Sequence, residues 1–103
     1  MFIQVTTTTD SLEAARALAR SAVEARLAAC AQISGPIESV YRWLGQIEQA
    51  REWVVVFKTL ASVYPRLEAH VRENHSYDVP EILATPVSEG NPAYLSWVEE
   101  NAS

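Results

Sequence analysis

The chain has 103 residues, close to the commonest length of a single domain and too short for two full domains. Hydrophobic residues make up 49% and charged residues 20% of the chain, a composition typical of a globular protein. Eight basic residues against thirteen acidic ones give a net charge of −5. This balance argues against nucleic acids and anionic membrane surfaces as partners, because both are bound through clustered Lys and Arg.

The sequence also argues against a membrane protein, a secreted protein and a protein built on disulfides or a multi-cysteine zinc site. No apolar run approaches the roughly 18 residues that span a bilayer, and residues 1–5 show no feature of a signal peptide. The single cysteine, Cys30, excludes an internal disulfide framework and a multi-cysteine zinc site. The three glycines match neither common phosphate-loop pattern. We therefore expect a cytoplasmic protein.

The N-terminal part predicts a strand followed by a helix. Residues 2–8 alternate apolar and polar side chains and are rich in β-branched types, which favours a strand. Asp10, with Glu13 three positions later, resembles a capping box. Apolar residues then recur at helical spacing, and we expect this helix to end near Arg26.

The middle of the chain predicts two strands joined by a tight turn. Residues 29–43 are extended in character, with a bulge or bend expected at Ser34-Gly35-Pro36. Residues 44–46 predict the turn, and residues 51–59 predict a strongly apolar strand.

The last part predicts a second helix, an edge strand and a short closing helix. Ser62 is the expected cap of the second helix, which carries Pro65 in its first turn and ends near His75. Residues 82–87 form the expected last strand, at a sheet edge because of its proline. Asn91-Pro92 then begins a short helix that runs through Trp97 and Glu100.

This order of elements, β-α-β-β-α-β plus a terminal helix, predicts an α+β fold. It is the ferredoxin-like arrangement, with an antiparallel sheet and two helices on one face, and it makes residues 1–103 a single domain.

One strand suggests self-association, because it is apolar on both faces. Trp53, Val55 and Phe57 alternate with Val54 and Val56. Each such side chain left exposed would forgo roughly 1.5–3 kcal/mol of burial. Either self-association or the terminal helix would cover the second face, and we expect an oligomer.

Five segments in register resemble the divalent-cation tolerance family, usually called CutA. They are Arg26-Leu27-Ala28-Ala29-Cys30-Ala31-Gln32-Ile33, Val40-Tyr41-Arg42-Trp43-Leu44-Gly45-Gln46-Ile47-Glu48, Phe57-Lys58-Thr59, His75-Ser76-Tyr77-Asp78-Val79-Pro80-Glu81-Ile82 and Gly90-Asn91-Pro92-Ala93-Tyr94-Leu95-Ser96-Trp97. The resemblance covers essentially the whole chain. It implies a cytosolic homotrimer of ferredoxin-like subunits, similar to nitrogen-regulatory PII-like trimers, and a role in the response to metal ions, copper in particular. No agreed catalytic reaction comes with it.

The candidate metal ligands are imidazole, thiolate and carboxylate groups, which copper and zinc prefer. They are Cys30, His70, His75, Asp78 and Glu81. His70 and His75 would lie about 140° apart on a helix, so they do not form a local pair. We predict His75, Asp78 and Glu81 as the metal residues; the alternative is a His75 that satisfies carbonyl groups. His70 and Cys30 are interpreted as structural, the cysteine as a packed core thiol.

The resemblance also predicts that copper binding is weak. Copper proposals for the family involve a cysteine in the first strand and a histidine pair, and the matching residues here are Thr6, Asn74 and His75. A hydroxyl is a poor copper ligand beside a thiolate. We therefore expect no obligatory cofactor, and Cu(II) or another divalent cation only as a weakly bound ion.

Other family-matched residues are aromatic or charged and could line a small-ligand pocket or anchor an interface. They are Tyr41, Trp43, Glu48, Lys58, Tyr77, Glu81, Tyr94 and Trp97. Lys58 is expected either to snorkel or to pair with a carboxylate such as Glu48 or Glu81. Ser76, His75 and Asp78 are too close in sequence for a catalytic triad, so we expect no enzyme.

Three functions remain open. The first is a metal-response protein that binds divalent cations weakly. The second is a PII-like sensor of a small molecule, and the third is a scaffold that binds another protein.

Overall fold

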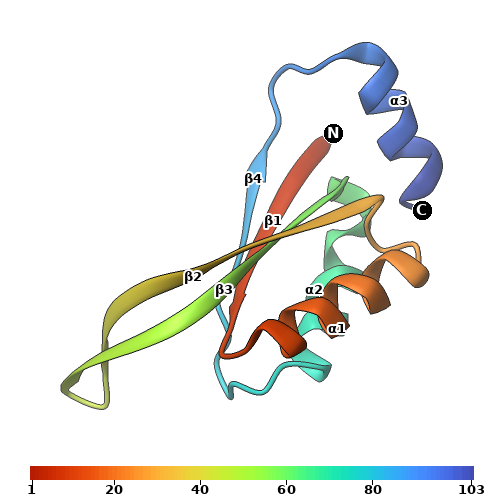
Figure 1. The fold of residues 1–103 in the computed structure, drawn as a ribbon. Helices are drawn as coiled ribbons and strands as arrows, with labels where there is room; N and C mark the ends of the chain where they lie inside the picture. The colour runs from red at the N-terminus through yellow and green to blue at the C-terminus, as the bar shows by residue number, and fades with distance from the viewer.

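The computed structural model describes all 103 residues, which form a four-stranded sheet and three α-helices (Figure 1). In chain order these are β1 (Phe2–Thr9), α1 (Leu12–Glu24), β2 (Cys30–Trp43), β3 (Gln46–Leu60), α2 (Tyr64–Glu73), β4 (Ile82–Pro86) and α3 (Pro92–Asn101). A short 3₁₀ turn, Ala61–Val63, precedes α2. The predicted order of strands and helices is confirmed, as is the α+β class.

All strand pairings are antiparallel, and the sheet order is β2-β3-β1-β4. β1 pairs with β3 along its full length, from Phe2 opposite Leu60 to Thr9 opposite Trp53. β4 lies at the edge of the sheet, as its proline predicted.

The main core lies between one face of the sheet and helices α1 and α2. Val5, Val55 and Phe57 point to this face and are fully buried. They pack against side chains of the two helices, Leu18 and Leu67 among them. Burial of each such side chain stabilises the fold by roughly 1.5–3 kcal/mol, which fixes the alternation of β1 and β3.

Four predicted boundaries are wrong. Ser11, not Asp10, caps α1, and its hydroxyl accepts a hydrogen bond from the Ala14 N–H at 3.0 Å. β1 extends to Thr9, so the chain turns into the helix one residue later. Ser62 does not cap α2, because it lies inside the 3₁₀ turn that precedes this helix. β3 begins at Gln46 rather than Arg51, because its polar first residues pair with β2.

The start of β3 and the end of β2 form a two-stranded arm that projects from the sheet (Figure 1). The arm comprises residues 37–52. β1 pairs with β3 only as far as Trp53, so no third strand supports the arm. The molecule measures 45 × 25 × 22 Å, and its radius of gyration of 14.1 Å exceeds the roughly 13 Å of a compact domain this long. The predicted turn is confirmed at the tip, where Leu44 and Gly45 have φ values of 51° and 80°.

The predicted bulge is also confirmed, and it decides where the arm's side chains point. Ser34 pairs with Val54 and Ile37 pairs with Glu52, so Gly35 and Pro36 together face the single residue between these partners. One extra residue in a strand transfers all following side chains to the other face. Alternate arm residues after the bulge therefore share a face with Glu52 and not with the main core.

The other face of the sheet, which we call the open sheet face, is only partly covered. It carries Thr6, Thr8, Val54, Val56 and Leu83. α3 covers one end of it, where Val98 and Ala102 form a small second core with Phe2 and Ala29. Elsewhere the face is uncovered in the single chain, and the Leu83 side chain is 60% exposed. The terminal helix thus covers part of the apolar second face and leaves the rest uncovered in the single chain.

Candidate functional site

A cavity of about 570 Å³ lies where the arm, the end of β1 and the loop before β4 meet. We call it the arm cavity. Its lining is Thr8, Ser39, Val40, Tyr41, Trp43, Glu52, Tyr77, Asp78, Val79 and Glu81. The bulge at Gly35 contributes to it directly, because it turns the alternate residues Ser39, Tyr41 and Trp43 toward the side of Glu52.

Glu52 is the one charged residue of the chain that is buried, with 7% of its surface exposed. The Tyr77 hydroxyl donates a hydrogen bond of 2.8 Å to its Oε2 atom. Burial raises the pKa of Tyr77, and the bonded Glu52 carboxylate raises it further, since a second negative charge beside the carboxylate is unfavourable. Tyr77 therefore remains a hydrogen-bond donor well above neutral pH.

His75 fixes the loop that carries Tyr77. Its Nδ1 atom accepts a hydrogen bond of 3.1 Å from the Tyr77 N–H, so the proton of the neutral ring lies on Nε2. The Nε2–H group then donates to the Thr8 carbonyl oxygen at 2.7 Å. The rings of His75 and Tyr77 are 4.9 Å apart between centroids. Of the two interpretations of His75, carbonyl satisfaction is the one that the geometry favours, with the carbonyl supplied by β1.

The charged side chains that line the arm cavity are all negative. Three carboxylates line it, those of Glu52, Asp78 and Glu81, and no Lys, Arg or His does. Two aromatic side chains of the arm and one of the loop, Tyr41, Trp43 and Tyr77, form much of the remaining wall. This combination of carboxylates and aromatic rings can attract a positively charged molecule.

The three predicted metal residues lie on one segment but do not form a ready metal centre. Asp78 and Glu81 line the arm cavity and are exposed, whereas both ring nitrogens of His75 are already hydrogen-bonded. Nowhere in the chain do three or more His, Cys, Asp or Glu side chains converge as they would around a metal ion. A cation at this loop would have to displace at least one bond of His75 to gain its imidazole.

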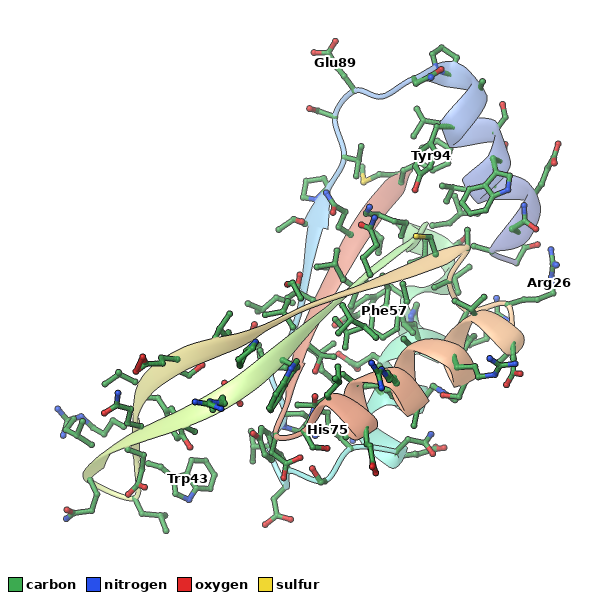
Figure 2. All side chains as sticks on the ribbon, viewed as in Figure 1. Arg26, Trp43, Phe57, His75, Glu89 and Tyr94 are labelled. Carbon is green, nitrogen blue, oxygen red and sulfur yellow. The ribbon has the colours of Figure 1, made fainter.

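The predicted pocket residues fall into two groups at opposite ends of the molecule. Figure 2 shows Trp43 near the tip of the arm and Tyr94 on α3 at the far end. Lys58 and Tyr94 line a separate cavity of about 220 Å³. Trp97 stacks near Tyr94, with ring centroids 5.6 Å apart. Lys58 donates to the Gln32 side chain at 2.7 Å, so the expected pairing with Glu48 or Glu81 is wrong.

The remaining candidate residues have structural surroundings. His70 Nε2 lies 2.8 Å from the Ser21 hydroxyl and joins α2 to α1, as a structural histidine should. Cys30 is half-buried and is not part of the main core, contrary to prediction, because β2 places it on the open sheet face. Burial and the nearby Cys30 thiol raise the pKa of Tyr94. Glu48 pairs across the arm with Tyr41 and is exposed.

Sequence reasoning missed Glu52, the one buried charged residue of the arm cavity. The available signal was a carboxylate directly before the apolar run Trp53-Val54-Val55-Val56-Phe57, in a position that a strand would bury.

Comparison with known proteins assigns the chain to a family. The CutA1 divalent ion tolerance protein family matches residues 3–101. The divalent-cation tolerance protein CutA of Thermus thermophilus is 44% identical over 94 residues, which are 91% of each chain. The human protein CutA is 44% identical over 86 residues, 84% of this chain and 48% of that protein. The chain belongs to the CutA1 divalent ion tolerance family.

Solved structures of relatives have the same fold. The Thermus thermophilus divalent cation tolerance protein superposes with a TM-score of 0.98 at 42% identity, and each chain is covered completely. The Archaeoglobus fulgidus protein, described as a periplasmic divalent cation tolerance protein, gives a TM-score of 0.97 at 35% identity over the full length of both chains. The chain spans only about half the length of its plant and animal relatives. None of its helices is long and apolar enough to cross a bilayer.

Proposed function

We propose that this protein acts in the cellular response to divalent cations as a cytoplasmic homotrimer. Its membership of the divalent ion tolerance family supports the general role. The strand order β2-β3-β1-β4, with helices after β1 and β3, is the arrangement that we class as ferredoxin-like. We propose no enzymatic activity. The proposed partners are further copies of the same chain, a divalent cation, and a small molecule or a protein.

The unsupported arm is the observation that favours an oligomer. An isolated two-stranded hairpin is marginal in water, yet this one exposes large apolar side chains on residues 37–47. Val40 is 68%, Ile47 62% and Leu44 86% exposed. A homotrimer would cover both the arm and the open sheet face. Light scattering on a size-exclusion column should give the mass of three chains; a mass of one or two chains would exclude the trimer.

Weak divalent-cation binding at the loop 75–81 is the activity proposed for each subunit. Asp78 and Glu81 supply accessible oxygen ligands beside the negative arm cavity. His75 supplies an imidazole only after it releases Thr8 or Tyr77, and this lost hydrogen bond keeps the affinity low. Cu(II) or another divalent cation is the expected ion, and no obligatory cofactor is proposed.

Calorimetric titration of metal-free protein with Cu(II) and with Zn(II) tests this proposal. We expect saturable binding near one ion per chain, weakened in the combined variant Asp78→Asn and Glu81→Gln and in His75→Ala. Glu99→Gln is the matched control. It removes an exposed carboxylate from α3, which is distant in sequence from the loop 75–81. No saturable binding, or equal binding in all variants, would contradict a metal site at this loop.

The arm cavity favours a second candidate function, a PII-like trimeric sensor or signalling scaffold without chemistry of its own. Its volume of about 570 Å³ falls within the range of small-molecule sites, and it combines aromatic walls with a few polar groups. A ligand bound only by the folded protein raises the melting temperature by mass action. A screen of charged and neutral metabolites should therefore contain stabilising compounds; a scaffold whose partner is a protein would respond to none of them.

A further inference from the structure

We propose that Lys58 of one subunit of the homotrimer is the counter-charge of the buried Glu52 of the next subunit, in an ion pair that sets how the open sheet faces meet. This inference rests on the proposed homotrimer and names the two residues that join its subunits.

The first observation is that Glu52 has no cationic partner within its own chain. Only 7% of its surface is exposed, and a buried carboxylate is costly unless a positive group compensates it. Its hydrogen-bond donor, the Tyr77 hydroxyl, is uncharged. The two salt bridges of the chain are Arg20–Glu24 and Arg72–Glu68, and neither involves Glu52. The compensating charge must therefore come from outside the chain, and in a homotrimer its source is a second copy.

The second observation is that only one basic side chain shares a sheet face with Glu52. Side chains alternate along a strand, so Glu52, Val54, Val56 and Lys58 of β3 all point to the open sheet face. The neighbouring positions of this face on the other three strands are uncharged. They are Gln4, Thr6, Thr8, Cys30, Gln32, Ser34, Leu83 and Thr85.

The other basic residues of the chain point elsewhere. Four of them lie on α1 and α2, the helices that cover the opposite face of the sheet. Arg26 donates to backbone carbonyl oxygens at the C-terminal end of α3. Arg42 and Arg51 alternate with Tyr41 and Glu52, so they lie on the other face of the arm. Lys58 is therefore the basic side chain that the open sheet face offers to a second copy.

Lys58 has hydrogen-bond donors to spare for a second partner. It is half-buried and donates to the Gln32 side chain at 2.7 Å. An ammonium group has three N–H donors, so two remain. Lysine stems pack on apolar surface while the charged head reaches a polar group, and the rings of Tyr41 and Trp43 offer such a surface beside Glu52.

The spacing of the two charges excludes a pair within one subunit. Lys58 follows Glu52 by six positions, which in a strand corresponds to about 20 Å. Val54 and Val56 lie between them, so the face runs from a negative end through an apolar middle to a positive end. In a closed three-fold ring each joint brings together two different patches of the subunit. The Lys58 end of one subunit can thus meet the Glu52 end of the next at every joint, and the pairing of opposite charges fixes their register.

Lys58 is the only lysine of the chain, so its ammonium group can be observed alone in a magnetic resonance spectrum of protein made with isotope-labelled lysine. An exposed ammonium group at neutral pH exchanges its protons with water too fast to give an N–H signal, whereas one in a buried ion pair is protected. We expect a Lys58 Nζ–H signal from the intact oligomer and its loss in Glu52→Gln. Absence of the signal from the parent protein, or its persistence in Glu52→Gln, would overturn the proposal.

Mixed oligomers test whether the pair crosses between chains. Labelled Glu52→Gln chains are refolded with an excess of unlabelled parent chains, so that each labelled Lys58 meets an intact Glu52 only on a neighbour. We expect the Lys58 signal to return. A signal that stays absent in oligomers of the same mass would overturn the proposal.

Thermal unfolding of Glu52→Gln, Lys58→Met and the double variant, at one protein concentration, tests the energetic link. Each single substitution should lower Tm by at least about 5 °C, and the double variant should fall little below the more affected single one. Arg66→Met, at an exposed position of α2, is the matched control and should change Tm by less than about 2 °C. Additive effects of the two substitutions, or coupling of Glu52 to Arg42 or Arg51 instead, would overturn the pair. If Glu52→Gln does not fold, an unchanged Tm in Lys58→Met would still do so.

Light scattering of the parent protein separates this inference from the proposed homotrimer. A mass of three chains without the Lys58 signal would reject the ion pair alone. A mass of two chains with Glu52 and Lys58 coupled would reject the three-fold symmetry and retain the pair. A mass of one chain would reject both.

Discussion

The substitution Tyr77→Phe removes one hydroxyl and leaves Glu52 without its hydrogen-bond donor. The Tyr77 hydroxyl lies 2.8 Å from Glu52 Oε2, and Glu52 is 7% exposed. Hydrogen bonds to charged groups contribute roughly 1.5–3 kcal/mol, and water from the adjoining cavity can replace part of the lost bond. We therefore expect the free energy of unfolding to fall by about 1.5 kcal/mol. For a chain of this length that corresponds to a decrease in Tm of roughly 6–12 °C.

The assay is thermal unfolding followed by circular dichroism at one fixed protein concentration, because the stability of an oligomer depends on concentration. Tyr41→Phe is the matched control: its ring lines the same cavity, and we expect a change below about 0.5 kcal/mol. The double variant with Glu52→Gln should show coupling between the two substitutions. A Tyr77→Phe protein as stable as the parent, or no more affected than Tyr41→Phe, would refute the assigned role of this hydrogen bond.

Three further predictions concern the bulge, the pH dependence and the arm. Gly35 has φ +140°, and a Cβ added there would lie 2.9 Å from Trp53 Cδ1. Gly35→Ala should therefore lower the free energy of unfolding by at least about 1 kcal/mol, measured by denaturant unfolding. An unchanged unfolding midpoint would contradict this prediction. The pKa of Tyr77 is raised above its ordinary value of 10.0, so its stabilising effect is complete below pH 10 and is lost as the pH rises further. The decline in Tm above pH 10 should be shallower in Tyr77→Phe, and identical pH profiles would exclude this group as a cause. Val40→Asp places a charge on the exposed arm and should lower the oligomer mass in light scattering, whereas an undiminished mass would show that Val40 lies outside the interface.

The order of the elements could be predicted because the apolar patterns of the core are strong. Val5, Val55 and Phe57 alternate with residues of the other face, and Leu67 and Val71 recur at helical spacing, so burial alone specifies these elements. The boundaries were less certain because they depend on single hydrogen bonds. Ser11 and Asp10 are both good caps, and only the length of β1 decides between them. Residues 46–50 showed no strong pattern because their pairing is with β2 and not with the core.

The candidate site was harder to predict because it is made by contacts between distant residues. The sequence indicated Tyr41, Trp43, Tyr77 and Glu81, but it also grouped them with residues of the opposite end of the molecule. The separation follows from the length of the arm, which carries Trp43 away from Tyr94 (Figure 2). The role of Glu52 depends on the one-residue shift at the bulge and on the path of a loop 25 positions further along the chain. Neither feature has a periodic signal in sequence.

His75 illustrates how the structure changes the interpretation of a residue. In the sequence it is an accessible imidazole beside two carboxylates, which is typical of a metal ligand. In the fold it joins β1 to the loop, and each ring nitrogen already has a partner. Its removal should therefore disturb the position of Tyr77 as well as any bound ion, which is why the carboxylate variants accompany His75→Ala in the metal titration.

The most direct test of a cation-binding homotrimer is an anomalous difference map from crystals soaked in Cu(II). The proposed function predicts three chains related by a three-fold axis, each with a peak beside Asp78 and Glu81. An assembly of another symmetry, or a three-fold assembly without copper at the loop 75–81, would contradict it.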